Sequence, residues 1–235
     1  MRPARLSRSL HKWLALLVGA QALVWIASGL YMVVVDIDFI HGDTLVRNEA
    51  VPVPASASWF PLAGVRARYP DIERVRIKGL PGFGRPLYEV TTTGSTVLLD
   101  AADGSILSPL GRARVMDLAR HYFAGDSRVS GIQLLTGTAP QEIQSRPLPL
   151  WRVEFDDWHE TTLYIHPDSG DLVTRRHRSW RWFDALWMLH IMDYDTRTNV
   201  NNVALRAATL AGSAFVVSGA WLLWFSFRRR KRQET

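Results

Sequence analysis

Residues 149–173 read PLWRVEFDDWHETTLYIHPDSGDLV, and residues 86–107 read PLYEVTTTGSTVLLDAADGSIL. Both stretches begin with Pro-Leu and an aromatic residue, continue as alternating strands, and end in a turn that contains glycine. The offset between them grows from 63 residues at the first proline to 66 at the last glycine, so the second hairpin has a longer turn around DDWHE. The pattern predicts a duplicated β-hairpin. Two pairs of positions should match: Tyr88 with Trp151, and Val90 with Val153.

A short amphipathic helix is predicted before each hairpin. The apolar residues of WFPLAGVRARYPDI (59–72) fall on one helical face, and those of RARVMDLARHYF (112–123) do the same. A further strand should follow each helix, namely VRIKGL (75–80) and GIQLL (131–135). Each copy is therefore expected to be a helix followed by a small antiparallel sheet. The two copies should occupy residues 36–110 and 111–179.

Two apolar segments enclose this repeat. Residues 13–35 read WLALLVGAQALVWIASGLYMVVV without a charge, and residues 207–227 are also uncharged. At ~1.5 Å per residue each is long enough to cross the ~30 Å hydrocarbon core of a bilayer. The first exceeds the usual ~7–15 residues of a signal-peptide core, so it is predicted to be an anchor. We expect transmembrane helices over 13–35 and 203–227.

The charges predict the orientation of these helices. The tails at 1–12 and 228–235 are strongly basic, whereas Asp36 to Leu205 carry 18 Lys and Arg against 21 Asp and Glu. Positive loops stay in the cytoplasm, so both termini should be cytoplasmic and the centre should be periplasmic, in a bacterial inner membrane. The formal net charge of +6 belongs mainly to the tails. It indicates contact with the lipid bilayer and no nucleic-acid partner.

Residues 180–202 are predicted to form an interfacial aromatic helix and a linker. Trp180–Met192 leaves almost no polar face and is too short to span, which is typical of a helix at the membrane surface. The chain has no cysteine, which excludes disulfides and thiolate metal sites. It also has no phosphate loop, Gly-x-Ser-x-Gly or His-Glu-x-x-His motif. We therefore expect no enzyme activity from the chain on its own.

The order of these features resembles the PepSY-domain family, in its form with PepSY-associated transmembrane helices. The resemblance rests on LSRSLHKWLALLVGAQALVWIASGLYM (6–32), on the two hairpins, and on RSWRWFDALWMLHIMDYD (178–195). It implies an α+β membrane protein in which two transmembrane helices flank two tandem PepSY-like units outside the cytoplasm. Larger members have four spans and this chain has two. A function that needs four helices would thus require a homodimer or another membrane protein.

The resemblance implies two alternative functions. The first is an accessory, partner-binding subunit that carries haem in membrane electron transfer or in the reduction of siderophore iron. The second is a periplasmic module that binds or inhibits an envelope protease. Both remain open at this point, because neither depends on a motif that the other lacks.

Three histidines are candidates for holding haem b, which between helices needs two imidazoles at one depth. His190 lies at the outer entrance to the second span, His41 lies just outside the first span, and His11 lies at its cytoplasmic end. His190 and His41 could share a haem, whereas His11 would need a second copy of the chain. The alternative is that all three are polar anchors at the membrane surface.

The other histidines are expected to be structural. His159 and His166 flank the second hairpin without acidic or thiol ligands at a firm spacing, so no metal site is predicted there. His121 should lie on a helix surface. His177, within a basic run, should face lipid headgroups.

Overall fold

A computed structural model describes residues 3–47, 51–53 and 58–231, and the side chains of 11–221 within these ranges together with that of Trp224. The chain divides into two compact units. One comprises Met1–Asp36 with Trp182–Thr235, and we call it the helical unit. The other comprises Ile37–Arg181, and we call it the sheet unit. Each is described by itself.

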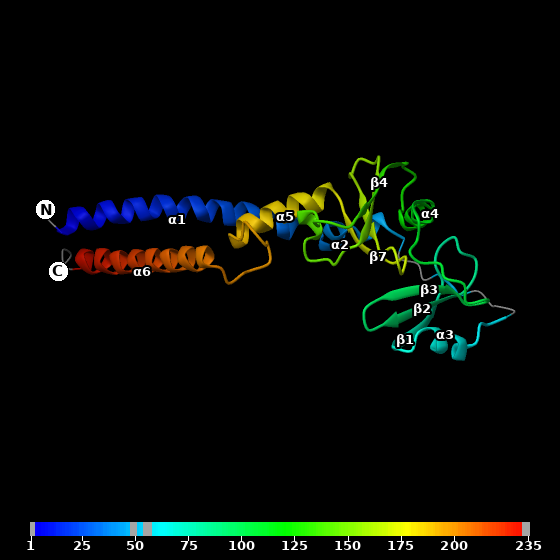
Figure 1. Cartoon of the computed structure of the whole chain (residues 1–235). Helices are drawn as coiled ribbons and strands as arrows, with labels where there is room; N and C mark the ends of the chain where they lie inside the picture. The colour runs from blue at the N-terminus through cyan, green and yellow to red at the C-terminus, as the bar shows by residue number, and fades with distance from the viewer. Residues whose placement is uncertain (1–2, 48–50, 54–57, 232–235) are drawn as a thin grey trace. The chain divides into compact units, whose positions relative to one another are not determined.

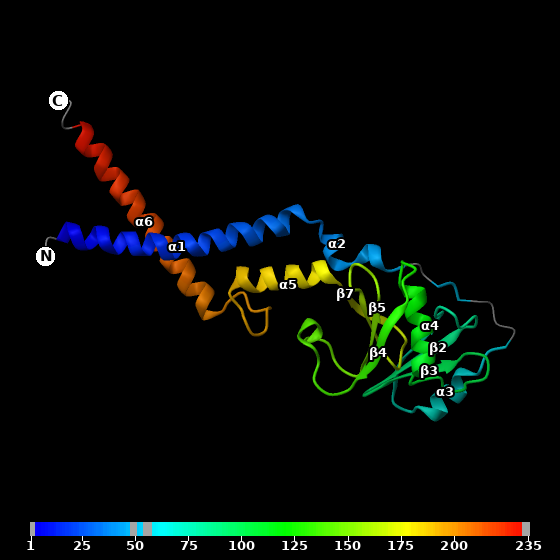
Figure 2. The same cartoon turned by 90° about the horizontal axis from the view of Figure 1, so that it is seen from above.

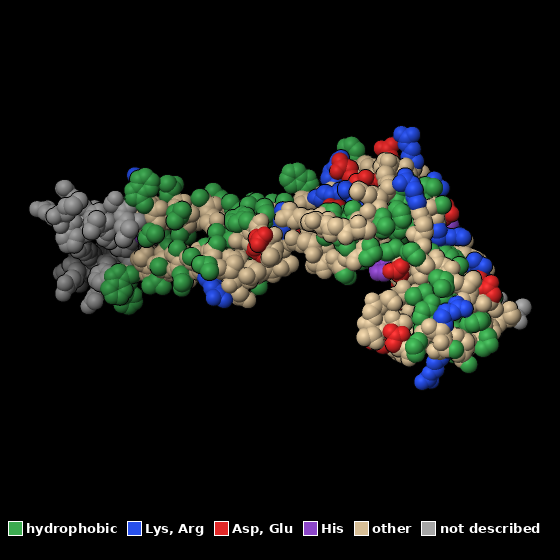
Figure 3. Space-filling model, viewed as in Figure 1, with side chains coloured by type: hydrophobic (Ala, Val, Ile, Leu, Met, Phe, Trp, Pro, Cys, Tyr) green, Lys and Arg blue, Asp and Glu red, His purple; other side chains and the backbone are tan. Residues whose placement is uncertain are grey.

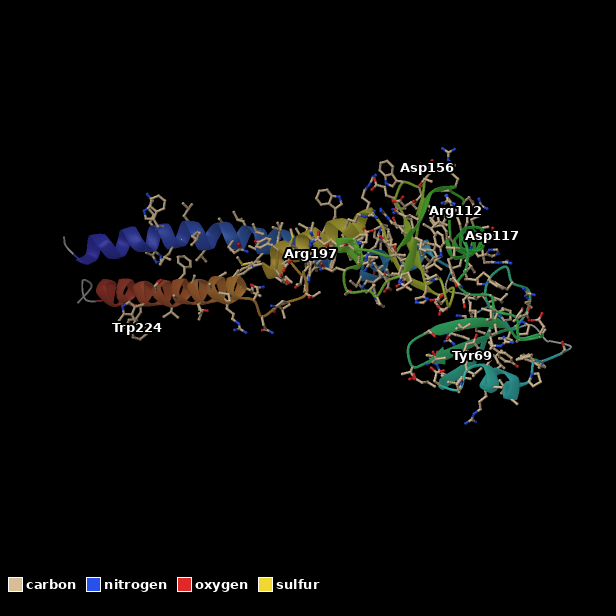
Figure 4. All side chains as sticks on the ribbon, in the orientation of Figure 1. Tyr69, Arg112, Asp117, Asp156, Arg197 and Trp224 are labelled. Atoms are coloured by element: carbon tan, nitrogen blue, oxygen red, sulfur yellow. The ribbon has the colours of Figure 1, made fainter. Side chains whose placement is uncertain are left out.

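The helical unit contains the two long helices that the sequence predicts. These are α1 (Pro3–Val34) and α6 (Val203–Lys231), and the end of α5 (Arg178–Ile191) packs beside α1. Both long helices are long and apolar enough to cross a membrane, over His11–Val34 and Val203–Trp221. Of the most apolar window in each, only 6% and 0% is buried by the protein. Figure 3 shows the apolar side chains along both helices, and Trp224 of α6 points away from α1 (Figure 4).

Helices α1 and α6 contact each other along one face of each. The half-buried positions recur every three to four residues, at Leu14, Ala15, Val18 and Gly19 of α1 and at Ala208, Ala211, Gly212 and Phe215 of α6. A Cβ at Gly19 or Gly212 would meet no atom within 4 Å, so neither glycine marks a close approach of the two backbones. The helices run side by side in Figure 1, and Figure 2 shows that α6 crosses α1 at an angle. Asn202 caps α6, because its Oδ1 accepts a hydrogen bond from the Leu205 amide at 2.8 Å.

The sheet unit contains two helix-plus-sheet repeats and a short lead-in. The lead-in is α2 (Ile37–His41) and η1 (Asp43–Leu45). The first repeat is α3 (Leu62–Arg68), β1 (Ile72–Lys78), β2 (Leu87–Thr92) and β3 (Thr96–Asp100). The second is α4 (Arg112–Tyr122), β4 (Val129–Leu135), η2 (Gln141–Ile143), β5 (Leu150–Phe155), β6 (Thr162–Ile165) and β7 (Leu172–Arg176). The antiparallel sheets have the orders β1-β2-β3 and β4-β5-β6-β7.

The strand register shows that the repeats are equivalent. Tyr88 pairs with Leu99 of the next strand, and Trp151 pairs with Ile165 of the next strand. Val90 and Val153 occupy the equivalent position two residues further along β2 and β5. The first strand of each sheet also carries a bulge at the same place, between Ile72 and Arg74 in β1 and between Val129 and Gly131 in β4. The repeats differ at β7, which the sequence pattern predicts only as a turn.

The two repeats share one apolar core. Val153, Leu163 and Ile165 of the second sheet pack against α4 and against residues of the first repeat. Leu87 and Leu98 come from the first sheet and lie on the face opposite Tyr88 and Leu99, which pack with Val65 of α3. Helix α4 therefore contacts residues of both sheets, whereas α3 packs only on the sheet of the first repeat.

A buried ion cluster joins the repeats at the edge of this core. The Lys78 ammonium lies 2.7 Å from Glu89 in the same sheet and 2.8 Å from Asp171, in the turn before β7. It also donates to the Ser169 carbonyl at 2.8 Å. Lys78 is 9% exposed and Glu89 is 4% exposed. Arg76 supplies a second cation to Glu89 at 3.0 Å.

We expect Lys78→Met to lower the free energy of unfolding by about 2–3 kcal/mol, because Glu89 would keep only the half-exposed Arg76. The double variant Lys78→Met/Glu89→Leu should recover most of this loss, because it leaves no buried charge uncompensated. Urea unfolding in detergent, followed by circular dichroism, measures both. Additive effects of the two substitutions would contradict the cluster.

Candidate functional site

His190 lies in the last turn of α5 and is fixed against α1 by a hydrogen bond to a buried serine. Its Nδ1 lies 2.9 Å from Oγ of Ser28. The His190 carbonyl accepts a hydrogen bond from Nε1 of Trp25 at 2.8 Å, so backbone and side chain are both attached to α1. Gly29 lies beside the ring: a methyl group at this position would be in ordinary van der Waals contact with Cε1 of His190, at 3.7 Å.

The bonds of Ser28 favour one tautomer of His190. Its hydroxyl has one hydrogen and lies 2.7 Å from the Val24 carbonyl and 3.2 Å from the Trp25 carbonyl, which can only accept. With the hydroxyl donating to the helix backbone, its oxygen accepts from Nδ1–H of His190. Nε2 then carries the lone pair, and it has no hydrogen-bond partner among the described residues. This is the form of imidazole that binds a metal.

Aromatic rings stack along α5 toward His190. Trp187 is nearly parallel to the imidazole, with 6.5 Å between ring centroids, and Phe183 stacks on Trp187 at 6.4 Å. Nε1 of Trp187 donates to the Arg197 carbonyl at 3.0 Å, in the loop after the helix. The ring of His190 thus lies in an apolar setting, and its neighbours are themselves held by hydrogen bonds.

A second histidine–serine pair joins α1 to α6. Nδ1 of His11 lies 3.3 Å from Oγ of Ser218, and the hydroxyl of Ser218 donates to the Phe215 carbonyl at 2.7 Å. The His11 ring stacks on Phe215 at 5.0 Å. Both histidines therefore meet a serine whose hydroxyl is bonded to its own helix. Nε2 of His11 also has no hydrogen-bond partner among the described side chains.

The structure does not bring these two histidines together. Ser28, the partner of His190, is seventeen residues beyond His11 on α1, a distance of about 26 Å along a helix. One chain therefore presents a single imidazole at each end of the described helix pair. This agrees with the expectation that His11 and His190 cannot share a haem within one chain.

His41, the third candidate, belongs to the sheet unit. Its side chain is exposed, and its possible ligand atoms lie within 4.8 Å of those of Asp38 and Asp43. The guanidinium of Arg175 forms an ion pair with Asp43 and donates to the His41 carbonyl at 2.9 Å. A cation at this cluster would compete with that arginine.

His177 differs from its sequence-based expectation. It does not face outward: it is 0% exposed, at the junction between β7 and α5. Its Nε2 lies 3.0 Å from the Ile40 carbonyl, and its ring contacts Phe39, which also contacts His159. The basic run misled the prediction, because Arg175, Arg178 and Arg181 form ion pairs with acidic side chains while the imidazole turns inward. Burial lowers the pKa of His177, and the neighbouring His159 acts in the same direction.

The loop between α5 and α6 is organised by a single carboxylate. Asp193 accepts hydrogen bonds from the Thr196 hydroxyl and from the amides of Thr198 and Asn199. These bonds, with that of Thr196 the strongest, hold the pKa of Asp193 well below its usual range. Arg197, labelled in Figure 4, forms an ion pair with Asp184 of α5. The loop therefore fixes the end of α5 that carries His190.

Sequence reasoning missed the two serines. Their signal is weak, because a serine within an apolar helix usually bonds its own backbone. Only the facing histidine distinguishes them, and that pairing is tertiary.

Comparison with protein-family models, with curated proteins and with solved structures finds no match to this chain.

The lowered pKa of His177 predicts loss of stability in mild acid. The unfolded imidazole has a pKa of about 6.5 and the folded one is lower, so the unfolded state binds more protons below about pH 6.5. The free energy of unfolding should be fully maintained above this pH and should fall as the pH drops below it. Urea unfolding of the full chain in detergent at pH 7.5 and pH 5.5 measures the loss.

His177→Gln keeps a donor for the Ile40 carbonyl but does not titrate, so it should remove part of this pH dependence. His121→Gln, at an exposed site, is the control and should leave it unchanged. An equal pH dependence in wild type and His177→Gln would contradict the assignment.

Proposed function

We propose that this chain is a PepSY-type membrane protein with two spans, whose sheet unit lies in the periplasm and whose termini lie in the cytoplasm. Support comes from the two apolar helices, which the protein leaves almost entirely uncovered, and from the basic tails. The equivalent register of the two sheets supports a tandem repeat of one domain type. In this role the chain is an accessory subunit that binds a partner, rather than an enzyme.

We further propose that the helical unit carries haem b, which His190 and His11 would hold at opposite membrane depths. The observation that carries this proposal is the pairing of His190 with Ser28, which holds Nδ1 and leaves Nε2 unpaired. The residues fit one half of a bis-imidazole site at each depth. A bound haem would supply one-electron redox chemistry at these positions.

The other half of each site must come from elsewhere. For His11 and for His190 alike, a second copy of the chain supplies the same residue. The uncovered faces of α1 and α6 leave room for such a partner. A homodimer would bring four spans together, with one pair of His11 side chains and one pair of His190 side chains at different depths. That arrangement suits a subunit that passes electrons across the membrane, for example toward siderophore-bound iron.

The topology is tested with reporter fusions. A reporter that is active only in the cytoplasm should give signal when fused to either terminus. A reporter that is active only in the periplasm should give signal when inserted at Gly94, in the turn between β2 and β3. A cytoplasmic signal from the Gly94 insertion would exclude the proposed orientation.

The haem proposal is tested by absorbance. Chain purified in detergent from haem-sufficient cells should show a Soret band and, on reduction, split α and β bands. His190→Ala and His11→Ala should each remove about half of the haem, because each takes one ligand pair. Ser28→Ala should keep most of the haem but shift its reduction potential, because outer-shell hydrogen bonds tune a ligand's basicity.

His121→Ala is the matched control and should retain the full spectrum. A preparation without Soret absorbance, alone or with its native partners, would reject the haem and favour a role as a binding module.

A further inference from the structure

A cavity of about 560 Å³ lies between α1 and α6. Four alanines of α6 line one wall, and Leu17, Gln21 and Trp25 belong to the wall of α1. No charged side chain lines the cavity. This volume is within the range of about 300–1,000 Å³ that is usual for small-molecule sites. Its lining fits a lipid-soluble molecule and disfavours an ionic one.

Gln21 is the one lining residue with an amide side chain, and the amide has no partner. Its Nε2 is buried and makes no hydrogen bond, and no described residue bonds to its Oε1. Ser28 and Ser218, the serines of the two histidine pairs, both bond their own backbone. Gln21 therefore differs from these polar residues of the same helix pair.

Gln21 lies too deep in the apolar segment for its amide to form hydrogen bonds with lipid headgroups or water. It lies ten residues from His11 and thirteen from Val34, the ends of the apolar segment, which is about 15 Å and 20 Å along the helix. A glutamine side chain is too short to reach headgroups or water from there. In hydrocarbon an unpaired amide is costly, and such polar residues in spans commonly mark functional sites.

We propose that this cavity binds a lipid-soluble molecule that carries a ring or chain carbonyl or hydroxyl, of the quinone and quinol type, and that Gln21 hydrogen-bonds that oxygen. An amide suits both forms, because its NH₂ donates to a quinone carbonyl and its oxygen accepts from a quinol hydroxyl. The inference rests on the proposed membrane placement and not on the haem.

The test uses the full chain in lipid nanodiscs, with decylubiquinone as the probe. Quenching of tryptophan fluorescence should saturate, because Trp25 lines the cavity. Gln21→Met keeps the length of the side chain and removes the amide, and should weaken binding at least about tenfold. The same variant should unfold at an equal or higher temperature, because an unpaired polar group is lost. A purely structural glutamine would not give this combination.

Ala207→Leu fills the cavity from an exposed position of α6 and should also abolish saturable quenching. Ala214→Leu makes the same change on an exposed face outside this cavity and is the matched control, with unchanged binding. Competition by 1-dodecanol distinguishes the sources of the oxygen. Displacement of the quinone supports a site for lipid hydroxyls in general, and its absence supports a site selective for the quinone ring.

Linear quenching without saturation, or equal affinity in Gln21→Met, would overturn the inference. The haem spectrum is independent of that result, so the two proposals fail separately. A chain that does not incorporate into nanodiscs would overturn the membrane placement and this inference with it.

Discussion

The protein leaves almost the whole apolar surface of α1 and α6 uncovered, and this constraint governs the other features of the helical unit. With the placement proposed above, a helix pair that meets hydrocarbon on most sides must pair its polar side chains internally. Ser28 and Ser218 meet this requirement through their own backbones and through His190 and His11. Those histidines are consequently oriented, and Nε2 of each has no hydrogen-bond partner among the described residues. The amide of Gln21 has no such internal partner. The cavity that Gln21 lines is therefore proposed as a second, separate site.

The sheet unit obeys a different rule, because its stability depends on a core that both repeats share. Neither repeat buries all of its apolar residues alone: Leu87 and Leu98 of the first pack with α4 of the second. The ion cluster around Lys78 closes the same interface, with Lys78 and Glu89 buried and Asp171 half-exposed. The two repeats therefore form one folded body rather than two independent domains. A change at the interface should affect both sheets.

Features that depend on local patterns were predictable from the sequence, and features that depend on tertiary contacts were not. The helix at 112–123 and the matched pairs around Tyr88 and Trp151 follow from periodicity and turn chemistry. The strand β7 was missed, because its pairing partner gives no signal within LVTRR itself. His177 was wrongly predicted to face outward. Its burial depends on contacts with Ile40 and Phe39, which lie more than 130 positions away in the sequence. The serine–histidine pairs escaped notice for the same reason.

The bond between His177 and the Ile40 carbonyl has an evolutionary consequence. This hydrogen bond connects the beginning of the sheet unit to its end. The ion pair between Arg175 and Asp43 connects the same two segments. In the sequence, the sheet unit is inserted between the two parts of the helical unit, and its first and last segments lie side by side. A module of this kind can be duplicated, exchanged or lost without rerouting the helices that carry it.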